Sequence, residues 1–243
     1  MYLINGILHT MASDVICDGF VSFEHGKITA AGRMDELQLP EQAEVLDVTG
    51  CHIYPGLVDA HSHLGMFGDS LGFESDDGNE ITDPVTPQLR AIDAINPFDR
   101  CFQEAREGGV TTVVTGPGSA NAIGGQMAAI KTVGRRVDDM ILRAPVAMKF
   151  ALGENPKSCY NDRHETPITR MATAALIREE LFKAREYLEK KDRAAADEDA
   201  DAPEFDLKLE ALIPVIRGEL PAHFHAHRAD DIATAVRIAK EFG

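Results

Sequence analysis

The sequence lacks tryptophan and has few basic residues for its length of 243. Lys and Arg number 24 against 40 Asp and Glu, so the formal net charge is −16 with histidine neutral. A protein that binds nucleic acid or an anionic membrane replaces counterions with clustered Lys and Arg, and this balance argues against both partners. With 44% hydrophobic and 26% charged residues, the composition is typical of a globular protein and not of a disordered one.

Long apolar runs and closely spaced cysteines are also absent from the sequence. No stretch approaches the roughly 18 apolar residues that span a bilayer, and the first residues have neither the basic region nor the apolar core of a signal peptide. The cysteines are far apart and form no Cys-x-x-Cys pair; they are Cys17, Cys51, Cys101 and Cys159. We therefore predict reduced thiols in a cytoplasmic protein.

The first 54 residues predict a small domain of short strands. Residues 3–8, 18–23, 28–32 and 44–48 are rich in β-formers. Gly26 lies between two of these runs, where glycine adopts the positive φ of a hairpin turn without a Cβ clash. These features predict a small β-sandwich over residues 1–54.

Residues 55–243 predict a second domain in which strands alternate with helices, as in a parallel βα sheet. The predicted strands are residues 53–59, 110–115, 127–132, 145–152 and 221–225. The predicted helices begin at Asn96–Pro97, 168 and 207, with a last helix capped by Asp230 or Asp231. A closed barrel of eight βα units usually takes about 250 residues, so about five strands predict the first part of such a barrel.

The ends of two predicted strands carry five of the nine histidines, namely His61, His63, His223, His225 and His227. The first two are two residues apart at the end of the strand at 53–59, so their side chains point the same way and can share one metal ion. Of the other three, at most one or two can face a single site. Because neutral imidazole suits Zn²⁺ and similar ions, this distribution predicts a divalent metal site.

Lys149 lies inside the apolar strand at 145–152. An unpaired ammonium is costly to bury, so the side chain either reaches the strand end near Glu154 or faces inward and becomes a metal ligand. Tyr160 and Arg163 follow where a loop over the site is expected, and Arg163 is a candidate partner for a substrate carboxylate. An ordinary charged surface loop explains the same residues equally well.

With these residues the chain resembles the amidohydrolase superfamily of metal-dependent hydrolases, and most closely its imidazolonepropionase-related branch. The resemblance covers essentially the whole chain. It rests on the Gly26–Lys27–Ile28 hairpin, Pro55–His63, Gly109–Val113, Met148–Lys149–Phe150 and the paired histidines near His225. The His-x-His with its Pro-Gly lead is specific for the superfamily, whereas the other pieces are individually weak.

The resemblance implies a (β/α)8 TIM-type barrel, incomplete in this chain, and a hydrolase that uses metal-activated water on a small-molecule substrate. The bond cleaved would be a non-peptide C–N bond in a cyclic amide or a related compound. The implied ligands of one or two divalent ions, most readily Zn²⁺, are His61, His63, Lys149 and His225, with Lys149 carboxylated by CO₂ to a carbamate. The resemblance leaves open whether His227 is a ligand, supports one or contacts substrate, and Glu154 is a competing ligand.

Two residues that the family uses have no counterpart before Gly243: a histidine on the sixth strand, and an aspartate on the eighth that acts as ligand and general base. The catalytic residue therefore remains unidentified. The expectation is a piece of a longer protein or a site that another chain completes. A non-catalytic assembly module, a deaminase of the same superfamily and a homo-oligomer all stay open.

Overall fold

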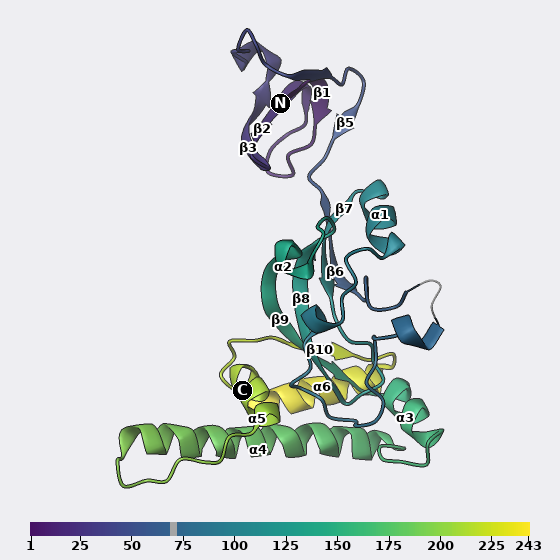
Figure 1. The fold of residues 1–243 in the computed structure, drawn as a ribbon, viewed down its shortest axis with the longest axis vertical. Coiled ribbons are helices and arrows are strands. Elements are labelled where there is room, and N and C mark those ends of the chain that lie inside the picture. The colour runs from purple at the N-terminus through teal and green to yellow at the C-terminus, as the bar shows by residue number, and fades with distance from the viewer. Residues whose placement is uncertain (69–71) are drawn as a thin grey trace. The chain divides into compact units, whose positions relative to one another are not determined.

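The computed structural model describes residues 1–68 and 72–243 and divides the chain into two compact units, Met1–Leu57 and Val58–Gly243 (Figure 1). Unit 1, the first of these, holds β1 (Tyr2–Leu8), β2 (Ile16–Glu24), β3 (Lys27–Arg33), a 3₁₀ turn η1 (Met34–Glu36), β4 (Val45–Asp47) and β5 (His52–Ile53). None of the described helices is long and apolar enough to cross a membrane.

A single mixed sheet forms unit 1, with the strand order β3-β2-β1-β4 and with β5 also paired to β1. β1 is antiparallel to β2 and parallel to β4 and β5. His25 and Gly26, with φ of 49° and 74°, make the turn of the predicted β2–β3 hairpin, which is confirmed. The described residues of unit 1 form this one sheet, so the two facing layers of the predicted sandwich are not confirmed.

Unit 2, residues 58–243, is built on a curled sheet with the strand order β10-β9-β8-β7-β6, which resembles half of a barrel (Figure 1). Its strands are β6 (Leu57–Ser62), β7 (Val110–Thr115), β8 (Ile123–Lys131), β9 (Ile141–Ala151) and β10 (Ala222–His225). Its helices are α1 (Arg100–Glu107), α2 (Val137–Met140), α3 (Glu154–Asn161), α4 (Arg170–Ala196), α5 (Leu207–Ile216) and α6 (Ala229–Phe242), with 3₁₀ turns η2 (Gly72–Ser75) and η3 (Ala91–Asp93).

The direction of β8 departs from the predicted parallel sheet. β8 is antiparallel to both β7 and β9, whereas β9 and β10 are parallel. Parallel neighbours need a crossover connection of a dozen or more residues, and the loop at 116–122 is too short to provide one. The chain therefore turns back beside β7, and the prediction of successive parallel strands is wrong at this point.

Some predicted ends lie elsewhere in the structure. The run at 53–59 is two strands, β5 and β6, because Pro55 lacks the N–H that a continuous ladder needs. α1 begins after Asp99, whose carboxylate accepts a hydrogen bond from the backbone N–H of Cys101, so the helix does not begin at Asn96–Pro97. In α6, Arg228 precedes the first turn, and Asp230 and Asp231 lie within that turn rather than at the cap.

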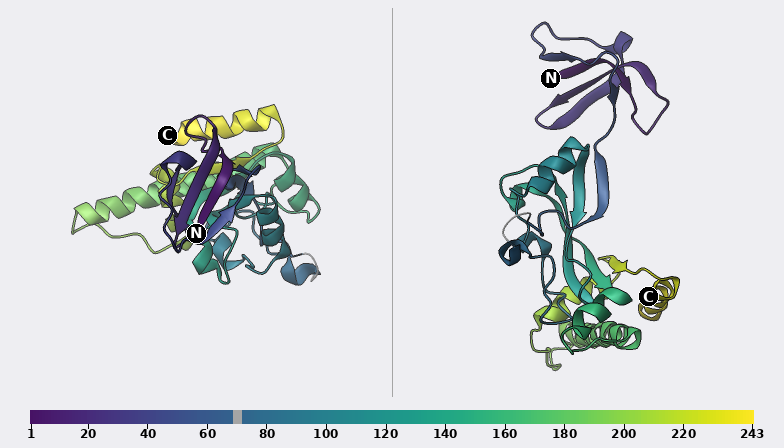
Figure 2. Two further views of the ribbon diagram at one scale, coloured as in Figure 1. Left: turned by 90° about the horizontal axis from the view of Figure 1, so that it is seen from above. Right: turned by 90° about the vertical axis from the view of Figure 1, so that its right-hand side faces the viewer.

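The larger core of unit 2 joins β8 and β9 to α4, α5 and α6. Met148 and Phe150 are buried in it, together with Ile177 of α4 and Ile238 of α6. Because side chains alternate along a strand, Lys149 faces the side of the sheet opposite to these two neighbours. Figure 2 shows α4 extending past the edge of the sheet, so only part of this helix packs on the core.

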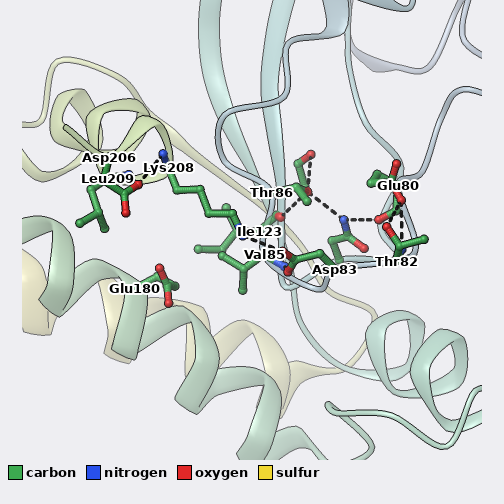
Figure 3. A network of polar contacts seen from close by, with 12 residues as sticks. Glu80, Thr82, Asp83, Val85, Thr86, Ile123, Glu180, Asp206, Lys208 and Leu209 are labelled. Atoms are coloured by element: carbon green, nitrogen blue, oxygen red, sulfur yellow. Dashed lines mark hydrogen bonds and ion pairs between the residues drawn. The ribbon is translucent and has the colours of Figure 1, made fainter. Parts of the chain in front are cut away.

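A buried polar network fastens the segment at 79–86 to the sheet (Figure 3). The Nδ2 of Asn121 donates to the carbonyl oxygen of Glu80 at 2.7 Å and to Oγ1 of Thr86 at 2.9 Å. Thr86 Oγ1 in turn donates to the carbonyl oxygen of Ile123 at 3.2 Å. The hydroxyl of Tyr160, a wholly buried residue, donates to Oδ1 of Asn121 at 2.7 Å. Asn121 is therefore the centre of this network.

A second polar contact holds the same segment to α5 (Figure 3). The Nζ of Lys208 lies 2.6 Å from Oδ2 of Asp83, and Oδ1 of Asp83 accepts a hydrogen bond from the backbone N–H of Val85 at 2.8 Å. Both ionic side chains are partly exposed, so the pair itself contributes little stability. Its role is to orient the turn that leads into the buried network.

Gly153, between β9 and α3, has a φ of 82°. A Cβ at this position would lie 2.4 Å from Oδ2 of Asp231, whereas a Cβ at Gly218, with a φ of 70°, would have no neighbour within 4 Å. We expect Gly218→Ala to lower the free energy of unfolding by about 1 kcal/mol from backbone strain alone. Gly153→Ala should lower it by about 3 kcal/mol, because it also displaces the carboxylate bonded to Arg170.

Urea denaturation of the two variants measures the difference. Gly218→Ala is the control, since both positions have a positive φ and only a Cβ at Gly153 would have a close neighbour. Equal losses in the two variants would show that Asp231 moves aside without cost and that the ion pair does not hold this turn in place.

Candidate metal centre

The ends of three strands place one lysine and four histidines close together, and we call this set the Lys149 cluster. Its members are His61 at the end of β6, His63 just after it, Lys149 in β9, and His223 and His225 in β10. β9 and β10 are parallel neighbours, and their register pairs His223 directly with Lys149. Because alternate residues share a face, His223 and His225 lie on the same side of β10.

Lys149 is wholly buried, and its Nζ lies 3.0 Å from Nε2 of His61. Within residues 1–68 and 72–243, no carboxylate forms an ion pair with it. Burial without a compensating anion lowers the pKa of the Lys149 ammonium to about 8. A substantial fraction of this amine is therefore neutral near pH 7 to 8, which an exposed lysine is not.

Three of the histidines around Lys149 have a lowered pKa, which favours the neutral ring at physiological pH. Desolvation, followed by the positive charge of Lys149, lowers the pKa of His61 to about 4. The same two causes, in the same order, lower the pKa of His223 and of His225 below the ordinary value for histidine. A neutral imidazole carries a lone pair on one ring nitrogen, so these three rings can act as ligands.

Hydrogen bonding leaves one nitrogen of His63 and one of His225 free for a ligand. Nδ1 of His63 lies 2.7 Å from the carbonyl oxygen of Gly116, which only accepts, so Nδ1 donates this hydrogen bond and Nε2 is the ring nitrogen left for a ligand. Nε2 of His225 is buried and has no hydrogen-bond partner in the part of the chain that the structure describes. An orphaned buried nitrogen of this kind calls for a partner from outside the chain.

Imidazole nitrogens are the donors that divalent transition metals prefer, and the cluster supplies four imidazoles beside the buried amine of Lys149. In the described ranges, no three His, Cys, Asp or Glu side chains are gathered closely enough to hold a metal ion by themselves. The ring centroid of His61 lies 5.4 Å from that of His63 and 4.6 Å from that of His223. The Nζ of Lys149 contacts Nε2 of the same His61 ring. Two features would be satisfied by a bound cation with an anionic Lys149: the buried His225 Nε2 without a hydrogen-bond partner, and the buried Lys149 amine, which contacts His61 but no carboxylate among the described residues.

His227 and Glu154 form a separate pair beside the Lys149 cluster. Nδ1 of His227 lies 2.5 Å from Oε1 of Glu154, and the ring centroids of His227 and His225 are 4.6 Å apart. Both side chains of the pair are half exposed. Glu154 therefore contacts His227 and not the lysine, and the pair lies where a molecule in the site could reach it from solvent.

The structure does not bring Tyr160 and Arg163 into the cluster. Tyr160 is wholly buried in the network around Asn121, and its burial raises the pKa of its phenol. Arg163 forms an ion pair with Glu165, with 3.6 Å between Nε and Oε2. Tyr160 therefore does not make the expected loop contact to a substrate. It hydrogen-bonds Asn121, which in turn holds the segment at 79–86.

His223 is one of the five histidines at the predicted strand ends, but the sequence assigned it no specific role among the ligands. Its position two residues before His225 already placed both side chains on one face of a strand. What the sequence lacked was the register of β10 against β9, which sets His223 beside Lys149. Pairing between strands 70 residues apart is not a local property of either strand.

Comparison with known proteins identifies several similar chains, although no family model matches this one. The amidohydrolase tasK of Hapsidospora irregularis is 34% identical over 244 aligned residues, which are 92% of this chain and 25% of that protein. A D-hydantoinase of Geobacillus stearothermophilus is 41% identical over 69 residues, 28% of this chain and 13% of that protein. An imidazolonepropionase of Acidiphilium cryptum is 41% identical over 73 residues, 28% of this chain and 18% of that protein.

The crystal structure of an amidohydrolase from Thermotoga maritima MSB8 superimposes on the chain with a TM-score of 0.93 at 44% sequence identity. The match covers 100% of this chain and 62% of that one. The chain thus spans about a quarter of the first curated relative and less than two thirds of the solved structure.

Proposed function

Because the chain belongs to the amidohydrolase superfamily, we propose that it contributes the metal centre of a hydrolase that cleaves a non-peptide C–N bond, in a cyclic amide or a related small molecule. The observation that carries this proposal is the buried Lys149, which has no carboxylate partner among the described residues and whose Nζ contacts the neutral imidazole of His61. A relative that is named a D-hydantoinase supports a cyclic amide as the substrate class.

In this proposal the ligands are His61, His63, Lys149 and His225. A divalent ion held by these residues, most readily Zn²⁺, would supply an activated water and polarise the substrate carbonyl. The histidines present neutral nitrogens, and the Gly116 carbonyl holds the His63 ring in the tautomer that a ligand needs. His223, opposite Lys149, packs on the ring of His61 and limits its rotation.

The role of Lys149 is to become an anion. Its neutral Nζ attacks the carbon of CO₂, a nitrogen–carbon bond forms, one C=O electron pair moves to oxygen, and the amine releases a proton. The resulting carbamate carries a negative charge where the ammonium had a positive one. This change removes the penalty of a buried cation and supplies the anionic ligand that the histidines lack.

The pair of His227 and Glu154 contacts substrate in this proposal. Its half-exposed position next to His225 places a carboxylate-bound imidazole at the edge of the cluster. Arg163 is the remaining candidate for a substrate carboxylate, since its side chain is only partly covered and its ion pair with Glu165 is long. Tyr160 acts through Asn121 and does not touch substrate.

Further parts of the proposal concern architecture and location. We assign unit 2 to the first part of a (β/α)8 barrel, supported by the curled sheet and its outer helices. Residues 1–54 are assigned to the small β-sandwich domain that accompanies such barrels, and 55–243 to the barrel. We propose a cytoplasmic location, as the widely spaced cysteines of the sequence predict.

Metal content tests the proposed function. After purification with Zn²⁺ and bicarbonate, we expect about two ions per chain, as for a centre with two divalent ions bridged by a carbamate. The double variant His61→Ala/His63→Ala should lose most of this metal, while His25→Ala, an exposed histidine of the β2–β3 turn, should retain it. Equal metal contents in all three proteins would contradict the proposal, because the retained metal would then not depend on the cluster.

A further inference from the structure

Unit 1 carries a second group of histidines, which is complete within its own sheet. β5 runs parallel to β1 with His52 opposite Ile7, and the N–H of His9 donates to the carbonyl oxygen of Ile53 at 2.9 Å. Alternation along each strand puts His9, His52 and Tyr54 on one face. We call these three residues the His9–His52 patch.

The rings of this patch lie nearly parallel. The centroids of His9 and Tyr54 are 4.2 Å apart with 10° between the planes, and those of His9 and His52 are 5.1 Å apart with 25°. Nε2 of His9 lies 2.8 Å from Nδ1 of His52. Stacking on Tyr54 limits the rotation of the His9 ring, so its Nε2 is held toward His52 before any ligand arrives.

We propose that the His9–His52 patch binds one divalent transition-metal ion of the Zn²⁺, Ni²⁺ or Cu²⁺ class. Two ligand nitrogens on a tetrahedral zinc ion lie about 3.3 Å apart, so the observed pair needs to open by only about half an ångström. The ion replaces the proton that the two nitrogens share, and water fills the remaining positions.

The chemistry of the patch selects this class of ion. Among the described residues, neither imidazole is hydrogen-bonded or ion-paired to a carboxylate, so the oxygen ligands that Ca²⁺ and Mg²⁺ require are missing. Imidazole nitrogen prefers borderline ions such as zinc, nickel and copper. His52 and Tyr54 are exposed, so an ion from solvent reaches the patch directly.

Zinc titration of the whole chain, followed by NMR of the histidine ring nitrogens, tests this proposal residue by residue. We expect Nε2 of His9 and Nδ1 of His52 to shift together, with one common midpoint. The readout resolves each ring, so zinc bound at the Lys149 cluster does not interfere. It also does not depend on any enzymatic activity.

Two variants provide the controls. His9→Phe keeps a flat ring stacked on Tyr54 but removes the nitrogen, and it should raise the zinc concentration at the His52 midpoint by about tenfold or more. His25→Ala, in the same unit but with its side chain almost fully exposed, should leave both midpoints unchanged.

Other outcomes overturn the proposal. Shifts of His52 alone would assign the ion to His52 and the neighbouring exposed Cys51. Separate midpoints for His9 and His52, both close to that of His25, would show independent surface imidazoles and no common site. If His9→Phe disturbs the sheet of unit 1, the joint titration of the unaltered chain still decides between these results.

Discussion

Lys149→Met should abolish metal retention at the Lys149 cluster and at the same time make the metal-free protein more stable. The substitution removes the one group that can become an anionic ligand, so the neutral histidines alone should not hold about two ions through purification. It also replaces a wholly buried amine, with no carboxylate partner in the described chain, by an apolar side chain of similar length. We expect the free energy of unfolding without metal to rise by about 1–3 kcal/mol.

Two measurements check this result, elemental analysis and urea denaturation in the presence of a chelator. The matched control is Lys131→Met, the same substitution at an exposed lysine of β8. It should leave the metal content unchanged and alter the free energy of unfolding by no more than about 0.5 kcal/mol. Full metal content in Lys149→Met would remove Lys149 from the ligands. A loss of stability would mean that the Lys149 amine has favourable contacts in the metal-free protein and that its burial is not a cost kept for metal binding.

The substitution Asn121→Leu should destabilise unit 2 by about 3–5 kcal/mol. Asn121 is almost completely buried, and leucine has a similar size but none of the polar atoms. The variant leaves the Tyr160 hydroxyl and the Glu80 carbonyl without their partner, and each unsatisfied buried group costs about 1–3 kcal/mol. We expect the segment at 79–86 to lose protection against amide hydrogen exchange before the rest of the sheet does.

A double-mutant cycle separates the network from simple packing. Tyr160→Phe alone should cost about 1–2 kcal/mol, since it leaves Oδ1 of Asn121 unpaired. Asn121→Leu together with Tyr160→Phe should cost less than the sum of the two, because the second change removes a group that the first had already left unpaired. Strict additivity in urea denaturation would show that the two side chains do not interact in solution.

Local patterns in the sequence predicted many of the elements and the residues worth examining. Alternation and glycine placement indicated the β2–β3 hairpin, and the run of β-branched residues at 110–115 is β7. The helices predicted from 168 and 207 are α4 and α5. His61, His63 and His225 were predicted because histidines two residues apart at a strand end point the same way, and Lys149 because an unpaired charge is costly inside an apolar strand.

Contacts between distant segments decided what the sequence left open. The turn of the chain at 116–122 made β8 antiparallel, which no property of residues 123–131 determines. The register between β9 and β10 makes His223 the neighbour of Lys149, and the pairing of β1 with β5 places His9 beside His52. Periodicity within one strand tells which side chains share a face, but the partner across the ladder depends on how separate segments pack. For that reason the sequence by itself determined which residues are candidates for the chemistry, and only the tertiary structure decided which of them meet.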